Sequence, residues 1–262
     1  MSQSFKRYEK KYLLDDKRYA YITEAIRDHV KDDIYKEYDL MSLYYDNDND
    51  ELIRRSIEKP LYKEKLRIRA YMPPKDDDMI QVELKKKYDG IVYKRRTRAR
   101  YRDVLDDIYG CEFEDVQTGE EIRYFLKHYG KLSPKIYTGC HRTSYKGIDD
   151  EDLRITFDKD MVYRTKDIYL GRNANDLPIN EGIIMEIKVK DALPLWLVQI
   201  LDEAKAYPRG FSKVGNAYLK EKEKENGTVQ NDIQRVIHSD AVYDRYSSQY
   251  GTGLYDRPVL HV

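Results

Sequence analysis

The chain has 262 residues, a mean hydropathy of −0.85 and a formal net charge of +0, from 48 basic and 48 acidic side chains. Balanced charge excludes a generally basic nucleic-acid coat, so we expect no specific nucleic-acid partner. No apolar run approaches the length that spans a bilayer, and the first residues lack the apolar core of a signal peptide. We therefore expect a cytoplasmic protein with no membrane segment in this chain.

Tyrosine and cysteine usage narrows the class of protein further. The 26 tyrosines against 5 phenylalanines favour a β-sheet protein with partly solvated surfaces, because a phenol ring packs against protein at one end and contacts water at the other. Cys111 and Cys140 stand in no metal-ligand or redox spacing, and the sequence leaves open whether they pair. Free, buried thiols are the default in a reducing cytoplasm. The five histidines carry no ligand pattern.

The amino-terminal part of the chain predicts a strand, a helix and a second strand. Residues 5–14 alternate as a strand does, and Asp15 and Asp16 are placed to cap a following helix. The packing stripe of that helix, at helical spacing, is Tyr19, Ile22, Ile26 and Val30. Residues 40–46 indicate the next strand. The acidic run at 46–50 lacks the glycine and the distal glutamate of a calcium loop, so it does not predict a calcium site.

Residues 63–98 hold the densest charge pattern in the chain. Side chains alternate between the two faces of a strand, so each of three predicted strands places a charged row on one face. These rows are Lys63, Lys65, Arg67 and Arg69 in the first strand, Gln81, Glu83, Lys85 and Lys87 in the second, and Lys94, Arg96 and Arg98 in the third. Asp89 and Gly90 form the two-residue hairpin turn between the second and third strands.

Such rows of cations have two interpretations. They face bulk water on an open sheet, or they line a channel that binds a polyanion. Like charges on neighbouring strands repel by roughly 1 to 4 kcal/mol per close pair, so that face must hold solvent or an anion. The repeated use of arginine, whose fork of donors suits phosphate oxygens, favours the anion. From these residues alone, both interpretations stay open.

The second half of the chain repeats the same alternation. A capping box at Thr118 and Glu121 begins a helix that Gly130 ends. Strands are predicted within residues 132–146, 153–164 and 183–190. Their charged positions include Lys135, Arg142, Arg154, Asp158, Glu186, Lys188 and Lys190. Asp191 and Pro194 then open another helix with a core-facing apolar stripe.

The domain organisation follows from the absence of a linker in the middle of the chain. We predict one domain over residues 1–225, which includes Lys213 just after the last apolar helix. Beyond it the chain becomes charged and then rich in tyrosine, serine and glycine, with little apolar periodicity. Residues 226–262 are therefore predicted to be a mobile or peripherally docked tail.

These elements predict an α+β fold built on a closed antiparallel β-barrel, with helices packed on the outside. The strands carry charge on one face and hydrocarbon on the other, and the amphipathic helices can cover the hydrocarbon. A dry interior is excluded, because unpaired buried charges cost several kcal/mol each. The interior of the barrel must hold water and anions.

Seven short motifs along the chain resemble those of a known family. The motifs are Glu9-Lys10-Lys11-Tyr12, Lys65-Leu66-Arg67-Ile68-Arg69, Val82-Glu83-Leu84-Lys85, Tyr93-Lys94, Arg154-Ile155-Thr156-Phe157-Asp158, Glu186-Ile187-Lys188 and Phe211-Ser212-Lys213. In this order they are similar to the polyphosphate polymerase domain of the vacuolar transporter chaperone (VTC) family, within the CYTH-like triphosphate tunnel metalloenzymes. The likeness runs over roughly residues 5–220. The chain departs from the eukaryotic pattern in having no appended phosphate-sensing domain and no membrane segments.

The resemblance implies a tunnel in which ATP and a growing polyphosphate chain meet with the help of Mn²⁺ or Mg²⁺. By motif position, the tunnel cations are Lys11, Arg67, Arg69, Lys85, Lys94, Arg154 and Lys213, and the metal ligand is Glu186. We also expect Lys65, Arg142 and Lys188 to bind polyphosphate. A separate membrane partner is possible, but the departure from the eukaryotic pattern leaves coupling of synthesis to export open.

The chemistry of these residues agrees with phosphoryl transfer. This reaction depends mainly on positioning and on neutralising oxygen charge, which cations supply. Arg67 and Arg69 could grip adjacent phosphates, and Lys85 and Lys94 could flank the transferred group. One glutamate with phosphate oxygens suffices for Mg²⁺ or Mn²⁺, so we assign the metal to Glu186.

Two other functions compete with the polymerase. A tunnel triphosphatase would hydrolyse tripolyphosphate or a nucleoside triphosphate with water as acceptor. A non-catalytic module would bind polyphosphate or RNA without nucleotide turnover, and its binding would depend strongly on salt. Cations outnumber acids on the charged rows, which favours a protein that holds a long polyanion.

Overall fold

The computed structural model describes residues 8–58, 60–89 and 91–226, and it divides the chain into two compact units, residues 1–221 and 222–262. The strands, all in the first unit, are β1 (Tyr8–Leu14), β2 (Val30–Asp46), β3 (Tyr62–Ala70), β4 (Met79–Tyr88), β5 (Ile91–Arg100), β6 (Ser133–Gly147), β7 (Arg154–Arg164), β8 (Leu177–Pro178) and β9 (Ile183–Val189). The helices are α1 (Asp16–Ala25), α2 (Glu51–Ile57), α3 (Tyr101–Asp107), α4 (Val116–Tyr129), α5 (Leu195–Glu203) and α6 (Lys213–Asn226), of which α6 begins in the first unit. The predicted tail, apart from Asn226, lies outside the described residues.

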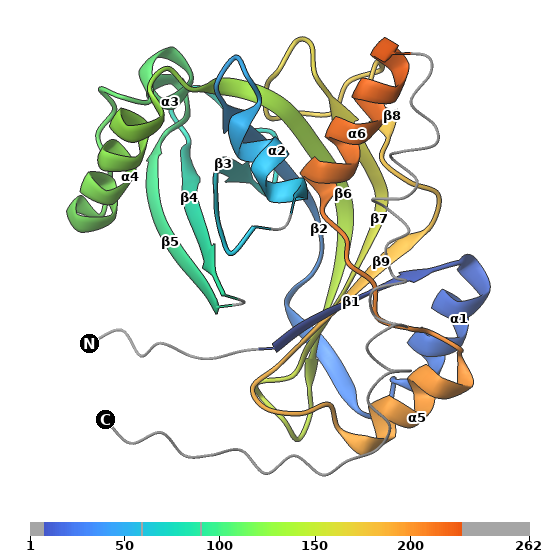
Figure 1. Ribbon diagram of the computed structural model, residues 1–262. Helices are drawn as coiled ribbons and strands as arrows, with labels where there is room; N and C mark the ends of the chain where they lie inside the picture. Colours follow the sequence, from blue (N-terminus) through green and yellow to red (C-terminus); the bar gives the residue numbers. More distant parts are fainter. Residues whose placement is uncertain (1–7, 59, 90, 227–262) are drawn as a thin grey trace. The chain divides into compact units, whose positions relative to one another are not determined.

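One antiparallel sheet organises the first unit and confirms the α+β class (Figure 1). Its strand order is β1-β9-β7-β6-β2-β3-β4-β5, and β8 pairs with β7. The closed barrel predicted from the sequence is not confirmed, because in the described part of the chain no ladder joins β1 to β5. These two strands are the edges of the sheet. Alternation shows which face of a strand is polar, but it does not show whether the first and last strands meet.

The two edge strands of the sheet, β1 and β5, have different neighbours. The backbone of residues 208–209 lies along β1, where Tyr12 forms an isolated bridge with Pro208 and the Arg209 amide donates to the Lys11 carbonyl at 2.7 Å. β5 pairs only with β4 among the described strands. The residues of β5 from Ile91 to Arg96 are exposed. We call residues 208–213 the strap, because the residues after Arg209 cross to other strands.

Two apolar cores cover one face of the sheet, which we call the outer face. One core joins α1 and α5 to β1, β7 and β9, with Ile22, Leu197 and Ile187 almost fully buried. The other joins α3 and α4 to β2 through β5 and includes Leu66 and Phe125. Four helices therefore pack against the hydrocarbon side of the charged strands, as predicted.

A third core lies on the opposite, inner face and corrects the prediction that all helices pack outside. Ile53 of α2 and Val214 and Ala217 of α6 pack there against a group that includes Leu40 of β2 and Ile184 of β9. Figure 1 shows α2 and the start of α6 in front of β2, β6 and β7. The inner face is apolar at this end, so two helices cover it and leave the charged rows beside them.

The acidic run at the end of β2 caps α2. The buried Asp46 carboxylate accepts from the amides of Leu52 at 3.0 Å, Ile53 at 2.8 Å and Asn47 at 2.8 Å. Its oxygens are therefore used by the backbone, which agrees with the absence of a predicted calcium loop. Within the described ranges, no three His, Cys, Asp or Glu side chains are grouped so as to hold a metal ion.

The predicted ends of the other helices are confirmed in some cases and wrong in others. Asp15 caps α1 by accepting from the Arg18 amide at 2.8 Å, as predicted. The predicted stripe of this helix extends too far, because α1 ends at Ala25 and Val30 begins β2. The cap of α4 is Asp115, whose carboxylate accepts from the Thr118 amide at 2.7 Å, so the predicted start at Thr118 is three residues late. Gly130, with φ of 71°, ends α4 as predicted. Among the helices of the described residues, none combines the length and apolar character needed to cross a membrane.

Candidate functional site

Strand register places the charged rows of the sequence on the inner face. Across β3, β4 and β5, the paired residues run Lys65, Lys85, Lys94 in one row and Arg67, Glu83, Arg96 in the next. Across β1, β9 and β7, Lys11 pairs with Glu186, and Lys188 pairs with Arg154. This face holds all the predicted site residues, namely Lys11, Lys65, Arg67, Arg69, Lys85, Lys94, Arg142, Arg154, Glu186, Lys188 and Lys213.

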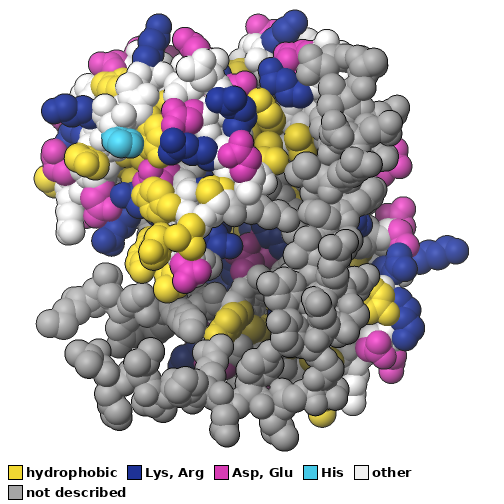
Figure 2. Space-filling view, viewed as in Figure 1, with side chains coloured by type: hydrophobic (Ala, Val, Ile, Leu, Met, Phe, Trp, Pro, Cys, Tyr) yellow, Lys and Arg dark blue, Asp and Glu magenta, His cyan; other side chains and the backbone are white. Residues whose placement is uncertain are grey.

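The sheet is curled so that its two halves face each other. Burial lowers the pKa of Lys65 of β3 and of Lys85 of β4. Lys11 of β1 lies close enough to both lysines to lower their pKa further. β1 is separated from β3 by four strands in the sheet order. Figure 2 shows basic and acidic side chains in the depth of a hollow near the middle of that view. The inner face is therefore a concave, charged surface.

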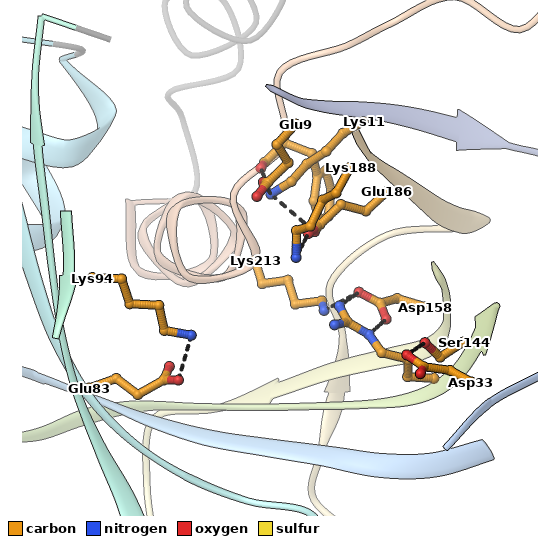
Figure 3. Close-up of polar contacts among 12 residues, drawn as sticks. Glu9, Lys11, Asp33, Glu83, Lys94, Ser144, Asp158, Glu186, Lys188 and Lys213 are labelled. Carbon is orange, nitrogen blue, oxygen red and sulfur yellow. Dashed lines mark hydrogen bonds and ion pairs between the residues drawn. The ribbon is translucent and has the colours of Figure 1, made fainter. Parts of the chain in front are cut away.

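Glu83 is the centre of the first charged cluster, on β3 to β5. Its carboxylate is 1% exposed, and Oε2 lies 2.5 Å from both Nε and Nη2 of Arg67. Oε1 accepts from Lys94 at 2.6 Å (Figure 3) and from Arg96 at 3.0 Å. Burial raises the pKa of Glu83, but Arg67, Arg69 and Lys94 outweigh burial and the pKa is held well below 4.5. Glu83 is therefore ionised and fixes the spacing of three cations.

Arg67 and Arg69 extend this cluster toward β2. Nη1 of Arg67 donates to the Tyr44 hydroxyl at 3.0 Å, and Arg69 donates to the Ser42 hydroxyl at 3.4 Å. Burial raises the pKa of Tyr44, but the charges of Arg67 and Arg69 reverse this and lower it overall. Positive charge thus exceeds negative charge here even with Glu83 ionised.

Asp158 is the centre of the second cluster, on β6 and β7. Its carboxylate is 1% exposed and accepts from Nε of Arg142 at 2.5 Å and from Nη2 at 2.7 Å. The ammonium group of Lys213 binds the same carboxylate and lies 3.3 Å from the Cys140 sulfur. Burial raises the pKa of Asp158, and the two cations more than reverse this. Arg142 and Lys213 are thereby held in place by a buried charge.

Glu186 is the centre of the third cluster, on β1 and β9 (Figure 3). Lys188 lies 2.6 Å from its carboxylate and Lys11 lies 3.9 Å away. Lys11 also lies 3.4 Å from Glu9, so one ammonium group joins two carboxylates. Burial raises the pKa of Glu186, but Lys188, Lys11 and Arg142 together hold it well below 4.5. Both carboxylates face the same space as Lys213 (Figure 3).

Arg154 is the predicted site residue that is held apart from these clusters. Its guanidinium binds the Asp33 carboxylate, which also accepts from the Ser144 hydroxyl at 3.1 Å. Burial raises the pKa of Asp33, whereas its backbone contact and Arg154 lower it overall. Arg154 therefore lies at the end of the inner face, beyond Glu186 and Asp158.

The strap joins the two halves of the inner face. The Phe211 carbonyl accepts from Lys11 at 3.2 Å, and the Ser212 hydroxyl accepts from Lys65 at 3.1 Å. Lys213 follows and binds Asp158. Three consecutive residues thus contact β1, β3 and β7: two of them position the cations Lys11 and Lys65, and the third, Lys213, is itself a cation bound to β7.

Lys65 and Lys85 lie between the clusters and are the least compensated cations of this face. Within the described residues, no carboxylate oxygen lies within ion-pair distance of either ammonium group, and Lys65 contacts only the Ser212 hydroxyl. Burial and then Lys85 hold the pKa of Lys65 well below 10.5. Burial lowers the pKa of Lys85, with Lys11 and Arg67, and Glu9 and Glu186 offset this only in part. A bound anion would raise the pKa of both lysines, so this part of the face favours anion binding.

Several residues of the site are not among the predicted ones. Glu83 belongs to a charged row of the sequence, and in the structure it pairs with cations of β3 and β5. Asp158 and Arg96 belong to the alternating rows, which is a signal that the sequence offers for them. Ser212 lies in a motif beside Lys213, but no pattern shows that its hydroxyl reaches Lys65.

A fold of one curled antiparallel sheet with a cation-rich inner face defines a class of anion-binding α+β protein. Residues 6–222 match the VTC domain family, so the chain belongs to that family. A search of curated proteins finds no match.

Three solved structures are similar to this chain at low identity. A "putative adenylate cyclase" from Vibrio parahaemolyticus has 10% identity and a TM-score of 0.45, over 82% of this chain and 99% of that one. A "putative adenylate cyclase" from Bacillus halodurans has 14% identity and a TM-score of 0.43, over 87% and 95%. The PH1819 protein from Pyrococcus horikoshii has 16% identity and a TM-score of 0.37, over 83% and 99%.

Proposed function

We propose that this protein is a polyphosphate polymerase, which transfers the γ-phosphoryl group of ATP to a growing inorganic polyphosphate chain on the inner face. One observation supports this most: Glu83 holds Arg67, Lys94 and Arg96 beside Lys65 and Lys85, which have no direct ion pair in the described part of the chain. Cations that are held in fixed positions and outnumber the neighbouring carboxylates are suited to bind a chain of phosphates. The chain belongs to the VTC domain family, and its motifs resemble those of polyphosphate polymerases, which is consistent with this proposal.

Each cluster has a role in the proposed reaction. Arg67 and Lys94, fixed by Glu83, bind the transferred phosphoryl group and neutralise the charge on its oxygens in the transition state. Arg69 and Lys85 hold the neighbouring phosphates of the same chain. Lys11, Lys65, Arg142, Lys188 and Lys213 line the path of the polyphosphate, and Arg154 marks its end. Because the cations are positioned before substrate binds, little reorganisation is needed.

The residues around Glu186 fit a divalent metal ion in chemistry and charge. Glu186 and Glu9 are carboxylates on paired strands, and both lie within 4.0 Å of the Lys11 ammonium group, a cation already held between them. Mg²⁺ and Mn²⁺ prefer oxygen ligands, and Mg²⁺ keeps several waters, so two carboxylates with phosphate oxygens suffice. When bound, the ion would neutralise phosphate charge. Glu186 would hold it, and Glu9 would order its waters.

The proposal is tested by the products made from ATP. Purified protein is incubated with ATP and Mn²⁺ or Mg²⁺, and the reaction is analysed by gel for long polyphosphate and by assay for ADP and free phosphate. A polymer with ADP supports the polymerase. ADP with free phosphate supports the triphosphatase, and neither product supports a non-catalytic polyphosphate-binding or RNA-binding module. A membrane partner, if one exists, is not needed for this assay.

Lys94 gives the proposed site a predicted pH dependence. Burial lowers the pKa of Lys94 to about 7, although Glu83 opposes the shift. Lys94 is therefore charged below pH 7 and neutral above it, and a bound polyanion raises its pKa. The affinity for long-chain polyphosphate should fall roughly tenfold between pH 6 and pH 8.5. Isothermal titration calorimetry at several pH values measures this.

A Lys94→Arg variant is the control for the pH dependence. Arginine keeps its charge over this range, so the affinity of the variant should change little between the same two pH values. Internal phosphates of a long chain stay ionised throughout, so the ligand contributes little to the difference. An equal loss of affinity in both proteins would show that Lys94 is not the titrating group.

A further inference from the structure

The free edge of β5 carries a row of exposed arginines that the proposed reaction does not use. Arg98 and Arg100 follow Arg96 at intervals of two residues, so all three point to the same side of β5. The side chains of Arg98 and Arg100 are 51% and 54% exposed. Register places Arg98 beside Gln81, which in turn pairs with Arg69. The row therefore leads from the inner face to the open edge of the sheet.

Arg98 and Arg100 are weakly compensated. Nε of Arg98 lies 3.9 Å from Glu114, and Nε of Arg100 lies 4.0 Å from both Asp77 and Asp103. These distances are too long for hydrogen bonds, and exposed ion pairs of this kind contribute little. In the described part of the chain, neither guanidinium group donates a side-chain hydrogen bond. Their donors are free for a ligand.

The opposite side of the same strand provides a contrast. Arg95 lies next to Arg96 but points to the outer face, where it donates to Glu121 of α4 at 3.2 Å. Arg95 thus has a hydrogen-bonded carboxylate, whereas Arg98 and Arg100 do not. The three side chains differ in bonding rather than in exposure, because Arg95 is 48% exposed.

We propose that Arg98 and Arg100 form a second polyanion-binding site, which holds a segment of the polyphosphate chain where the inner face continues along β5, away from Lys94. The identity of the ligand rests on the proposed function. The two residues are about 6.8 Å apart along the strand, so one extended chain can contact both. Arginine binds phosphate oxygens through two parallel donors. A second copy of the protein is a poor occupant of this edge, because pairing two β5 strands would bring like charges together.

The proposal is tested with an Arg98→Gln, Arg100→Gln double variant. Its affinity for long-chain polyphosphate should be about tenfold weaker than that of the wild type, and the slope of log affinity against log salt should fall by about two. Its affinity for tripolyphosphate should be unchanged, because three phosphates cannot occupy the inner face and the β5 edge together. Fluorescence anisotropy or calorimetry measures both ligands, and thermal unfolding checks that the variant is folded.

A matched control removes two charges elsewhere. Arg27 after α1 and Lys205 after α5 are 71% and 62% exposed, and each is ion-paired with a nearby acidic residue. An Arg27→Gln, Lys205→Gln variant has the same net charge as the test variant, and it should bind long-chain polyphosphate as the wild type does. An equal loss of affinity in both double variants would overturn the proposal, because the effect would then reflect net charge alone.

Other outcomes separate this site from the proposed function. Unchanged affinity of the Arg98, Arg100 variant for long chains, in a protein that makes polymer from ATP, would overturn the site and leave the polymerase standing. Loss of long-chain affinity in a protein that makes no polymer would support the site and remove the polymerase. If single-stranded RNA bound as tightly as polyphosphate and lost affinity equally, the assignment to polyphosphate would be overturned.

Discussion

An Arg67→Ala variant is expected to form ADP from ATP roughly 10³-fold more slowly than the wild type, because a preorganised cation at the transferred phosphoryl group would be lost. Arg67 is the best-positioned candidate, since Glu83 and Tyr44 fix its guanidinium from two sides. Glu83 keeps Lys94 and Arg96 as partners in the variant, so the fold should survive. Steady-state kinetics with ATP and Mn²⁺ measures the loss, and circular dichroism checks the fold.

Two further variants make the Arg67 result specific. Arg67→Lys keeps the charge but loses the fork of donors, so its activity should lie between those of Arg67→Ala and the wild type. Arg55→Ala removes an exposed arginine that pairs with Glu51 at 2.9 Å on α2, and it should leave activity unchanged. Glu186→Gln should also abolish turnover. Near-normal activity of both Arg67→Ala and Glu186→Gln would remove the proposed site.

An Asp158→Ala variant is expected to lose about 3 to 5 kcal/mol of unfolding free energy. Asp158 is 1% exposed and compensates Arg142 and Lys213, which are also largely buried. Removing the carboxylate leaves two buried cations without their partner, and that is more costly than losing an exposed pair. Urea denaturation followed by circular dichroism measures the change.

Controls and pH identify the cause of that loss. Asp48→Ala removes a carboxylate that is 84% exposed and pairs with Lys135, and it should change stability little. The cations hold the pKa of Asp158 below 3.8, so its contribution is present above pH 3.8 and is lost as pH falls through the lowered pKa. The variant and the wild type should therefore converge in stability only in strong acid. A loss of less than 1 kcal/mol at neutral pH would contradict the argument.

The rows of the inner face could be predicted from the sequence, because they depend only on alternation along single strands. Lys65, Arg67 and Arg69 fall on one face of β3 for any pairing partner. The helices α1, α4 and α5 were also predictable, since each has an apolar stripe with a cap or proline at its start. What these local patterns determine is which side chains share a face.

Long-range arrangements could not be predicted in the same way. The short helix α2 depends on the buried Asp46 carboxylate, which a sequence pattern shows only as part of an acidic run. The apolar contacts of α6 lie in its first turns, at Val214, Ala217 and Tyr218, and its later residues are mostly charged. The strap reaches three strands through Phe211 and Ser212, and no periodicity encodes such contacts.

The role of Glu83 shows a related limit. Its position in an alternating row predicts an ion pair, but the number of its partners depends on β3 and β5 both lying beside β4. One carboxylate therefore serves Arg67, Lys94 and Arg96 together. Sequence reasoning found the residues, and the sheet topology determined which of them share an anion.

The two edges of the sheet have different consequences for aggregation. Unpaired edge strands invite strand addition by another molecule. Along β1, the backbone at Pro208 and Arg209 occupies the place where another strand would add. Dissolved ions do not displace this segment, because it is part of the same chain. β5 relies instead on electrostatic repulsion, which is screened over about 10 Å at 0.1 M ionic strength and about 3 Å at 1 M. Concentrated salt therefore weakens the barrier to edge-to-edge assembly at β5 while leaving β1 blocked.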